Sequence, residues 1–320
     1  MATLVKQGLR VLIIGGSGLI GGRLGEYLQS TGCKVFLGTR DRVSWSWGWS
    51  PGLTLVDINW NKNNILEDVD SDIDVIVHAA GVNAQNSELD PEYALRINGL
   101  GTSRLLNSAI RLGVPRLVYI STAQVYGSSM VGEVAEDSSV NNLHPYATSH
   151  LAGEHAVRFS RKEKLIDGVV IRLANGYGAP VHRDVDCWRL LVNDLCRQAV
   201  TTNKIVLRSS GKQQRSFISL SNVCYVLGKL IEVKQYELTS DIFNVGSKKS
   251  LKVLDMAHLV QKRCIELLGT DIELVTQPSK ELEDPFSFNI TKLEDIEIKF
   301  QDNHTTEIDQ TLRFCMKNYC

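Results

Sequence analysis

The feature that most restricts this fold is a run of glycines between an apolar strand and a helix. Arg10–Ile14 reads RVLII and predicts a buried strand, and residues 15–21 continue as GGSGLIG. Leu19–Ser30 then predicts a helix, ended by Thr31-Gly32. Glycines at such a junction permit a tight turn whose bare N–H groups reach a pyrophosphate at the helix N-terminus. The pattern therefore predicts a dinucleotide site rather than a purely structural turn. The residues expected to line it are Gly15, Gly18, Leu19, Ile20 and Gly21.

Apolar runs alternate with helical stretches through the first half of the chain. The further predicted strands are Lys34–Leu37, Asp74–Ala79, Arg116–Ser121 and Gly168–Leu173, and a helix is predicted over Leu95–Leu112, ended by Gly113. This alternation predicts an α/β fold, a doubly wound parallel sheet of the Rossmann type with helices on both faces. We expect the dinucleotide-binding domain to span residues 1–175. A smaller C-terminal substrate-binding lobe over 176–320 is expected to be partly interleaved with it.

Net charge, apolar runs and cysteine spacing limit the classes of binding partner that we expect for this chain. The chain has 320 residues and a net charge of −1, which gives no reason to expect nucleic acid or a membrane surface as partner. No apolar run reaches membrane-spanning length, and the four-residue run near the N-terminus is too short for a secretory signal. Seven cysteines without a CxxC pair predict reduced thiols in a cytoplasmic protein. Because HExxH is absent too, no metal site is predicted.

The end of the second predicted strand bears on the choice of cofactor. A site for NAD usually carries an acidic residue about 20 residues after the glycines, where it binds the ribose 2′-hydroxyl. This chain has Gly38 at that place, and Arg40 follows. An arginine there can pair with a 2′-phosphate, so NADP(H) is favoured and NAD(H) remains possible. The alternative for Arg40 is an ordinary solvated side chain.

An ordered set of motifs resembles one family over nearly the whole chain, the extended short-chain dehydrogenase/reductases of the nucleotide-sugar epimerase/dehydratase kind. The matching segments are the glycine motif, Asp57-Ile58 after the third strand, VIVHAAG at 75–81, INGLGT at 97–102, YISTAQVYG at 119–127, PYATSH at 145–150, IRLANGYG at 171–178, RSFI at 215–218 and FNVG at 243–246. Single matches are weak, whereas the ordered set is specific.

The resemblance implies a role for particular residues. It places Asp57 and Ile58 near the adenine, and Ala79, Ala80, Asn98 and Ser121 along the rest of the cofactor. It assigns the chemistry to Thr122 and Tyr146, and the sugar-nucleotide diphosphate to Asn175 and Arg215. The family often has acids after the arginine, but this chain reads RSFISLSNV at 215–223, so anchoring of the substrate loop differs. A homodimer is expected by the same analogy, through the helices beginning near Asn98 and Tyr146.

The segment PYATSH departs from the family at one decisive position. Tyr146 is the expected acid/base, and the family has a lysine four residues later that lowers the tyrosine pKa and binds the nicotinamide ribose. This chain has His150 there, on the same helix face as Tyr146. Imidazole can bind ribose but is largely uncharged at neutral pH. Three interpretations stay open: a working substitute in catalysis, a binding protein that has lost catalysis, or an altered position. His78 is predicted to be a core histidine.

The reaction can be narrowed from the segment STAQVYG. Family members that form 4-keto-6-deoxy sugars resemble STDEVYG, with an Asp-Glu pair performing the elimination. Ala123 and Gln124 stand here instead, and neither can move a proton. This argues against a 4,6-dehydratase. We expect NADPH-dependent reduction of a 4-keto sugar nucleotide, with a 4-epimerase that uses bound NAD as the alternative. Trp45, Trp47 and Trp49 are expected to form an apolar flap on their own lobe or else a contact surface.

Overall fold

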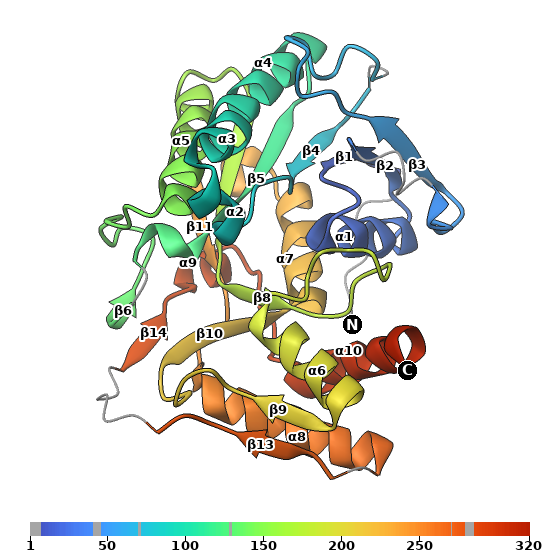
Figure 1. Cartoon of the computed structure of the whole chain (residues 1–320). Helices are drawn as coiled ribbons and strands as arrows, with labels where there is room; N and C mark the ends of the chain where they lie inside the picture. The colour runs from blue at the N-terminus through green and yellow to red at the C-terminus, as the bar shows by residue number, and fades with distance from the viewer. Residues whose placement is uncertain (1–7, 41–45, 70–71, 128–129, 270, 279–284) are drawn as a thin grey trace.

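A parallel sheet of seven strands forms the centre of the protein (Figure 1). The computed structural model describes residues 8–40, 46–69, 72–127, 130–269, 271–278 and 285–320. The strands, in the spatial order β11-β7-β5-β4-β1-β2-β3, are β1 (Arg10–Ile14), β2 (Lys34–Thr39), β3 (Leu53–Asp57), β4 (Val75–His78), β5 (Arg116–Thr122), β7 (Asp167–Leu173) and β11 (Ile242–Val245). All neighbours are parallel, so the predicted doubly wound sheet is confirmed.

Alternate residues of β1 belong to two cores, one on each face of the sheet. Val11 and Ile13 pack with α1 and α7, whereas Leu12 and Ile14 pack with α4 and α5. The helices are α1 (Leu19–Ser30), α4 (Thr102–Leu112), α5 (Pro145–Lys162) and α7 (Leu220–Glu232). Because side chains of a strand point alternately to opposite faces, a strand buried on both sides must be apolar throughout, as RVLII is. The strand order reverses at β1, and the crevice there opens at the carboxyl ends of β1 and β4.

The helix predicted over 95–112 consists of two elements. A π-helical segment, η2 (Leu95–Gly101), precedes α4, and the short helices α2 (Ala84–Leu89) and α3 (Pro91–Ala94) lead into it. Gly113 ends α4 with φ of +75°, as the sequence predicted. Gly99 and Gly101 allow α5 and the ring of Trp60 to approach η2 closely. Apolar spacing alone does not distinguish a π-helical turn from an α-helical one, so the change was not predicted.

A second layer of short strands and helices lies below the sheet in Figure 1. Its strands are β6 (Gly132–Val134), β8 (Asn175–Tyr177), β9 (Lys204–Val206), β10 (Gln214–Ser219), β12 (Ser250–Lys252), β13 (Glu273–Val275) and β14 (Phe286–Phe288). Its helices are α6 (Leu191–Thr202), α8 (Val253–Leu268) and α10 (His304–Tyr319), whereas α9 (Thr291–Asp295) packs against β11 of the main sheet. The chain returns from this layer to the main sheet through α7 and β11.

A buried ion pair joins the two layers. Arg23 of α1 donates to the Glu307 carboxylate of α10 at 2.9 Å and to the Ala179 carbonyl at 2.8 Å. Glu307 also accepts from the Ser221 backbone at the start of α7, so one carboxylate connects three elements. Separating the two layers would leave the Glu307 charge buried without its partner, which is costly. The ion pair therefore holds the two layers in one relative position. None of the described helices combines the length and the apolar character that crossing a membrane requires.

Candidate active site

The glycine-rich turn leads from β1 into α1 at the crevice. Gly15 has φ of +87°, and its N–H donates to the Gly38 carbonyl at 2.9 Å. A Cβ on Gly15 would lie 2.6 Å from the backbone nitrogen of Ala80, and one on Gly21 would lie 2.2 Å from the Gly15 oxygen. Gly18 precedes α1 without a side chain to occupy the first N–H groups. This cradle, which any side chain would fill, fits the pyrophosphate of a dinucleotide.

The end of β2 lies beside this turn and explains the missing acid. A Cβ on Gly38 would lie 2.9 Å from a side-chain carbon of buried Ile58 and 3.0 Å from one of Ile14, so the packed side chains there leave no room for a carboxylate. Arg40 is exposed, and its guanidinium donates to the hydroxyl of Tyr93. Asp57 ends β3 half-buried at the same edge of the sheet. The structure therefore places Arg40, Asp57 and Ile58 at the carboxyl ends of neighbouring strands, next to the glycine turn.

Thr122 and Tyr146 meet where β5 ends and α5 begins. Thr122 is the last residue of β5, its Oγ1 accepts from the Gln124 N–H at 3.1 Å, and its side chain lies near enough to Tyr146 to lower the pKa of that tyrosine. Pro145 occupies the first turn of α5, and the Tyr146 N–H donates to His144 Nδ1 at 3.1 Å, which fixes the helix start. Burial raises the pKa of Tyr146, and the Thr122 side chain opposes that rise. The proximity that the resemblance implied for this pair is present in the structure.

His150 lies one helical turn after Tyr146 and faces it. The two ring centroids are 4.6 Å apart in an edge-on arrangement. His150 is 5% exposed, and burial lowers its pKa to about 4, so the ring is neutral at physiological pH. Its Nδ1 lies 2.9 Å from the hydroxyl of buried Tyr119. A Cβ on Gly81 would lie 3.6 Å from its Nε2, which places the other ring nitrogen beside the segment after β4.

Buried Asn98 forms hydrogen bonds to two different segments of this site. Its Oδ1 accepts from the Val82 N–H at 2.8 Å, and its Nδ2 donates to Ser149 Oγ at 3.0 Å. These bonds tie the segment after β4 to α5, so the amide holds the walls of the crevice together. Ala79 and Ala80 are half-buried and border the crevice beside Gly15.

The Ser121 side chain is part of a buried charge network beside α5. Its Oγ donates to the Glu154 carboxylate at 2.5 Å, and Glu154 pairs with Arg172 of β7 at 2.8 Å. Glu154 is fully buried and Arg172 nearly so, and the Arg172 guanidinium lies 4.8 Å from the ring of Tyr126. Sequence reasoning did not identify this network. The signal was available, because Glu154 follows His150 by one helical turn.

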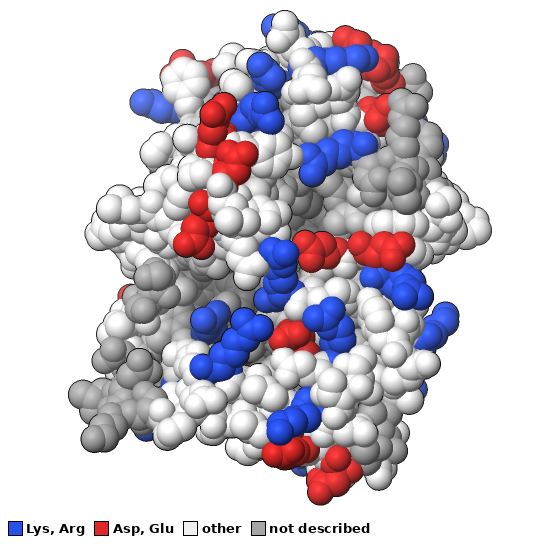
Figure 2. Space-filling model, in the orientation of Figure 1, with Lys and Arg blue, Asp and Glu red and all other residues white. Residues whose placement is uncertain are grey.

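Asn175 and Arg215 come together on neighbouring strands of the second layer. Strands β8 and β10 are parallel, and Arg215 donates to Asn175 Oδ1 at 3.4 Å. Asn175 in turn donates to the Ser216 carbonyl at 3.1 Å. Arg215 is exposed, and in Figure 2 Lys and Arg side chains border the hollow between the upper and lower parts of the molecule. A guanidinium and an amide at this position can bind an anionic group.

Comparison with known proteins agrees with this geometry. The model of the NAD dependent epimerase/dehydratase family matches residues 11–246. The chain belongs to this family. It is 25% identical to a dTDP-glucose 4,6-dehydratase of Streptomyces niveus, covering 80% of this chain and 78% of that one. It is 26% identical to UDP-glucuronic acid decarboxylase 1 of Danio rerio over 80% of this chain and 61% of the relative. An epimerase structure from Methanothermobacter thermautotrophicus superposes with a TM-score of 0.82 at 23% identity, covering 98% and 94% of the chains.

The tryptophan segment of this family member contacts both its own half of the molecule and the stretch that begins at His182. Trp45 lies outside the described residues. Trp49 packs on the core beneath α1, whereas Trp47 stacks on His182 at 4.5 Å, with the ring planes 10° apart. Arg189, which follows His182 along the chain, donates to Gln85 of α2 at 2.6 Å. The stretch from 182 to 189 is therefore attached at both ends to the dinucleotide-binding half.

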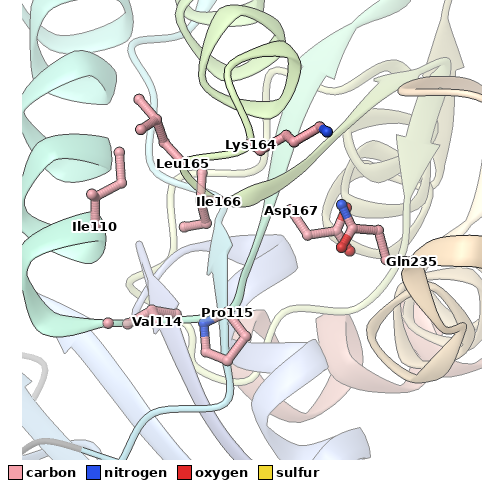
Figure 3. A pocket seen from close by; sticks show the side chains of 9 residues that line it. Ile110, Val114, Pro115, Lys164, Leu165, Ile166, Asp167 and Gln235 are labelled. Atoms are coloured by element: carbon pink, nitrogen blue, oxygen red, sulfur yellow. The ribbon is translucent and has the colours of Figure 1, made fainter.

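A separate pocket lies at the amino ends of β5 and β7, at the end of the sheet opposite the glycine turn (Figure 3). It is formed where α4 leads into β5 and where α5 leads into β7. Its lining includes Ile110, Val114, Leu165, Asp167 and Gln235. Asp167 is engaged by Arg116 and Arg161, and none of the residues that the family resemblance singles out lies here. We therefore assign the chemistry of this family member to the crevice and not to this pocket.

The close approach at Gly15 gives a direct test of the cofactor cradle. Gly15→Ala should weaken NAD(P)H binding by at least about 10-fold, because the new Cβ must displace the Ala80 backbone and about 1.4 kcal/mol corresponds to tenfold. Gly113→Ala is the matched control, since Gly113 also has positive φ but no atom within 4 Å of a Cβ. Both variants carry similar backbone strain. Titration of nicotinamide fluorescence measures the affinity, and equal losses in the two variants would contradict the cradle.

Proposed function

We propose that this chain reduces a 4-keto sugar nucleotide with NADPH, with Tyr146 as the proton donor. The observation that carries the proposal is the electrostatic state of Tyr146. Burial raises its pKa, Thr122 provides the one opposing interaction, and the neighbouring His150 ring is neutral. Among the described residues, no cation contributes to the pKa of Tyr146. The side chain is therefore a phenol at neutral pH, which can donate a proton but is a poor acceptor.

Reduction and oxidation need opposite forms of this tyrosine. The nicotinamide, when bound, supplies or takes up the hydride. In reduction, the Tyr146 Oη–H bond breaks as a proton goes to the sugar oxygen, so the phenol is the active form. In oxidation, which begins every epimerase cycle through a 4-keto intermediate, the phenolate must accept that proton. A tyrosine with a raised pKa and no lysine beside it favours the first direction. Thr122 lies beside Tyr146, so its hydroxyl would bind the same sugar oxygen.

Two other functions remain as alternatives within the family. The family description names NAD, which favours a 4-epimerase with a tightly held cofactor. A protein that binds the cofactor without turnover would also show a neutral His150. The similarity to a 4,6-dehydratase does not extend to elimination, because Ala123 is buried and Gln124 carries no titratable group. Asn175 and Arg215 would bind the diphosphate of the substrate in each case.

A substrate panel tests the proposal against both alternatives. UDP-, dTDP-, GDP- and CDP-linked 4-keto sugars are incubated with and without NADPH, and the products are analysed by mass. Reduction adds two hydrogens to one of the substrates and consumes NADPH, whereas epimerisation changes no mass and needs no added cofactor. Tyr146→Phe should abolish the reduction with nearly unchanged NADPH affinity, because the ring still packs and only the transferable proton is lost. Full activity of this variant would remove Tyr146 from the mechanism.

The pH dependence should differ between the two directions. Reduction should stay constant through neutral pH and fall only as Tyr146 ionises, above the ordinary tyrosine pKa, which burial raises further. Oxidation of the product should rise about tenfold per pH unit over the same range, following the phenolate fraction. His150→Lys places a positive charge beside Tyr146, so it should lower the tyrosine pKa and move both profiles to lower pH. Unmoved profiles would mean that position 150 does not influence Tyr146.

The preference for NADPH should depend on Arg40. If this guanidinium binds the 2′-phosphate, Arg40→Ala should lose a charge-assisted contact of about 1.5–3 kcal/mol, which is roughly 10- to 150-fold in affinity for NADPH. NADH affinity should change little. Arg111→Ala, at an exposed position in the last turn of α4, controls for the loss of positive charge. Equal affinity of the parent protein for the two cofactors would instead favour the NAD-dependent epimerase.

We further propose a cytoplasmic homodimer formed by η2 and α5. Leu95 and Leu100 of η2 and Phe159 of α5 are 48% to 61% exposed, and such a dimer would cover these apolar side chains. Phe159→Glu should convert a particle with the mass of two chains into a single chain, because a charge would be buried in the interface. Light scattering after gel filtration measures this mass. Ile265→Glu on α8, also exposed, is the control and should leave the mass unchanged.

A further inference from the structure

A chain of buried polar side chains extends from His150 through Tyr119 to Thr102 and His78. Tyr119, in the middle of β5, is fully buried, and its hydroxyl lies 2.9 Å from His150 Nδ1. The space for this hydroxyl exists because residue 153 is glycine, since a Cβ there would lie 2.6 Å from the Tyr119 oxygen. The Tyr119 ring centroid lies 5.2 Å from that of His78 and 5.9 Å from that of His150. Tyr119 is thus enclosed between the two imidazoles.

The direction of the hydrogen bonds follows from Thr102. Its hydroxyl donates to the Asn98 carbonyl at 2.6 Å, which uses its single proton. Toward His78 Nε2, at 3.0 Å, Thr102 therefore accepts, and His78 carries its proton on that nitrogen. Among the described residues, the hydrogen bond found for the Tyr119 hydroxyl is the one to His150 Nδ1, at 2.9 Å. Because leaving the proton of a buried hydroxyl without an acceptor is costly, Tyr119 donates and His150 Nδ1 accepts.

We propose that Tyr119 is a positioning residue that holds neutral His150 in the tautomer with its proton on Nε2. With Nδ1 accepting from Tyr119, the ring must present an N–H donor on the side that faces Gly81. That donor would bind a ribose hydroxyl of the cofactor where the family has a lysine ammonium. The ribose assignment rests on the proposed function, whereas the tautomer rests on the buried contacts alone. A donor at this position leaves the ribose hydroxyl its own proton, which is free to point to Tyr146.

Histidine ¹⁵N NMR on the protein without cofactor measures the tautomer directly. At neutral pH the parent should show His150 with Nε2 protonated and Nδ1 unprotonated, with the signals assigned from their loss in His150→Asn. Tyr119→Phe keeps the ring and removes the hydroxyl, so it should shift His150 toward a mixture of tautomers. It should also weaken NAD(P)H binding about 2- to 13-fold, the equivalent of one neutral hydrogen bond of about 0.5–1.5 kcal/mol.

Tyr177→Phe provides a matched control elsewhere in the molecule. The Tyr177 hydroxyl lies 2.8 Å from Nδ1 of His304, so this variant removes an equivalent buried hydroxyl from another Tyr–His pair. It should alter the His304 signals and leave both the His150 tautomer and cofactor affinity unchanged. A change of His150 in both variants would indicate a general loss of packing and would contradict the assigned role.

The parent spectrum decides the proposal even if Tyr119→Phe does not fold. A proton on His150 Nδ1 would reverse the hydrogen bond and overturn the proposal, and so would an unchanged tautomer in folded Tyr119→Phe. Failure of every 4-keto sugar nucleotide to react would defeat the proposed function but leave the tautomer result intact. The two failures are therefore distinguishable.

Discussion

The close approach of two backbones at the carboxyl ends of β1 and β4 is the constraint on which the site depends. Gly15 lies against Ala79 and Ala80 so closely that a single added carbon would overlap them. This contact exists because the strand order reverses at β1, which makes β4 its direct neighbour. It directs the glycine turn toward the crevice and places the segment up to Gly81 beside His150. One packing contact thus positions both the glycine turn and the segment that borders His150.

Burial decides the protonation state of nearly every polar group around this crevice. Tyr119, Tyr146, His78 and His150 are all held neutral, because desolvation disfavours their charged forms. The charges that do enter the interior are paired, as Glu154 and Arg172 are beneath Ser121. A lysine at position 150 would bring an unpaired cation next to His78 and Tyr119. Histidine avoids that cost, and the consequence is a tyrosine without electrostatic assistance.

The sequence predicted the fold because its strands, turns and helices follow from local patterns. RVLII before GGSGLIG specified the first strand, the turn and α1 with the observed ends. The family motifs implied that Thr122 and Tyr146 lie in one site, and the structure brings the two residues near each other. The contacts that surround His150 could not be predicted from the sequence. Tyr119 and His150 are 31 residues apart, and the closeness of the Tyr119 oxygen to residue 153 depends on how α5 packs on β5. Such contacts arise from tertiary packing and have no periodic signature.

The neutral pair of Tyr146 and His150 connects the packing of the core to the proposed direction of the reaction. A lysine would stabilise the phenolate in every state of the cycle and so would serve oxidation and reduction alike. A neutral N–H donor orients the cofactor without changing the charge felt by Tyr146. In the proposed reduction, the phenol would have its proton available for one transfer to substrate and would regain it from solvent after product leaves. A site built in this way suits an enzyme whose cofactor enters reduced and leaves oxidised, rather than one that must oxidise and reduce in each turnover.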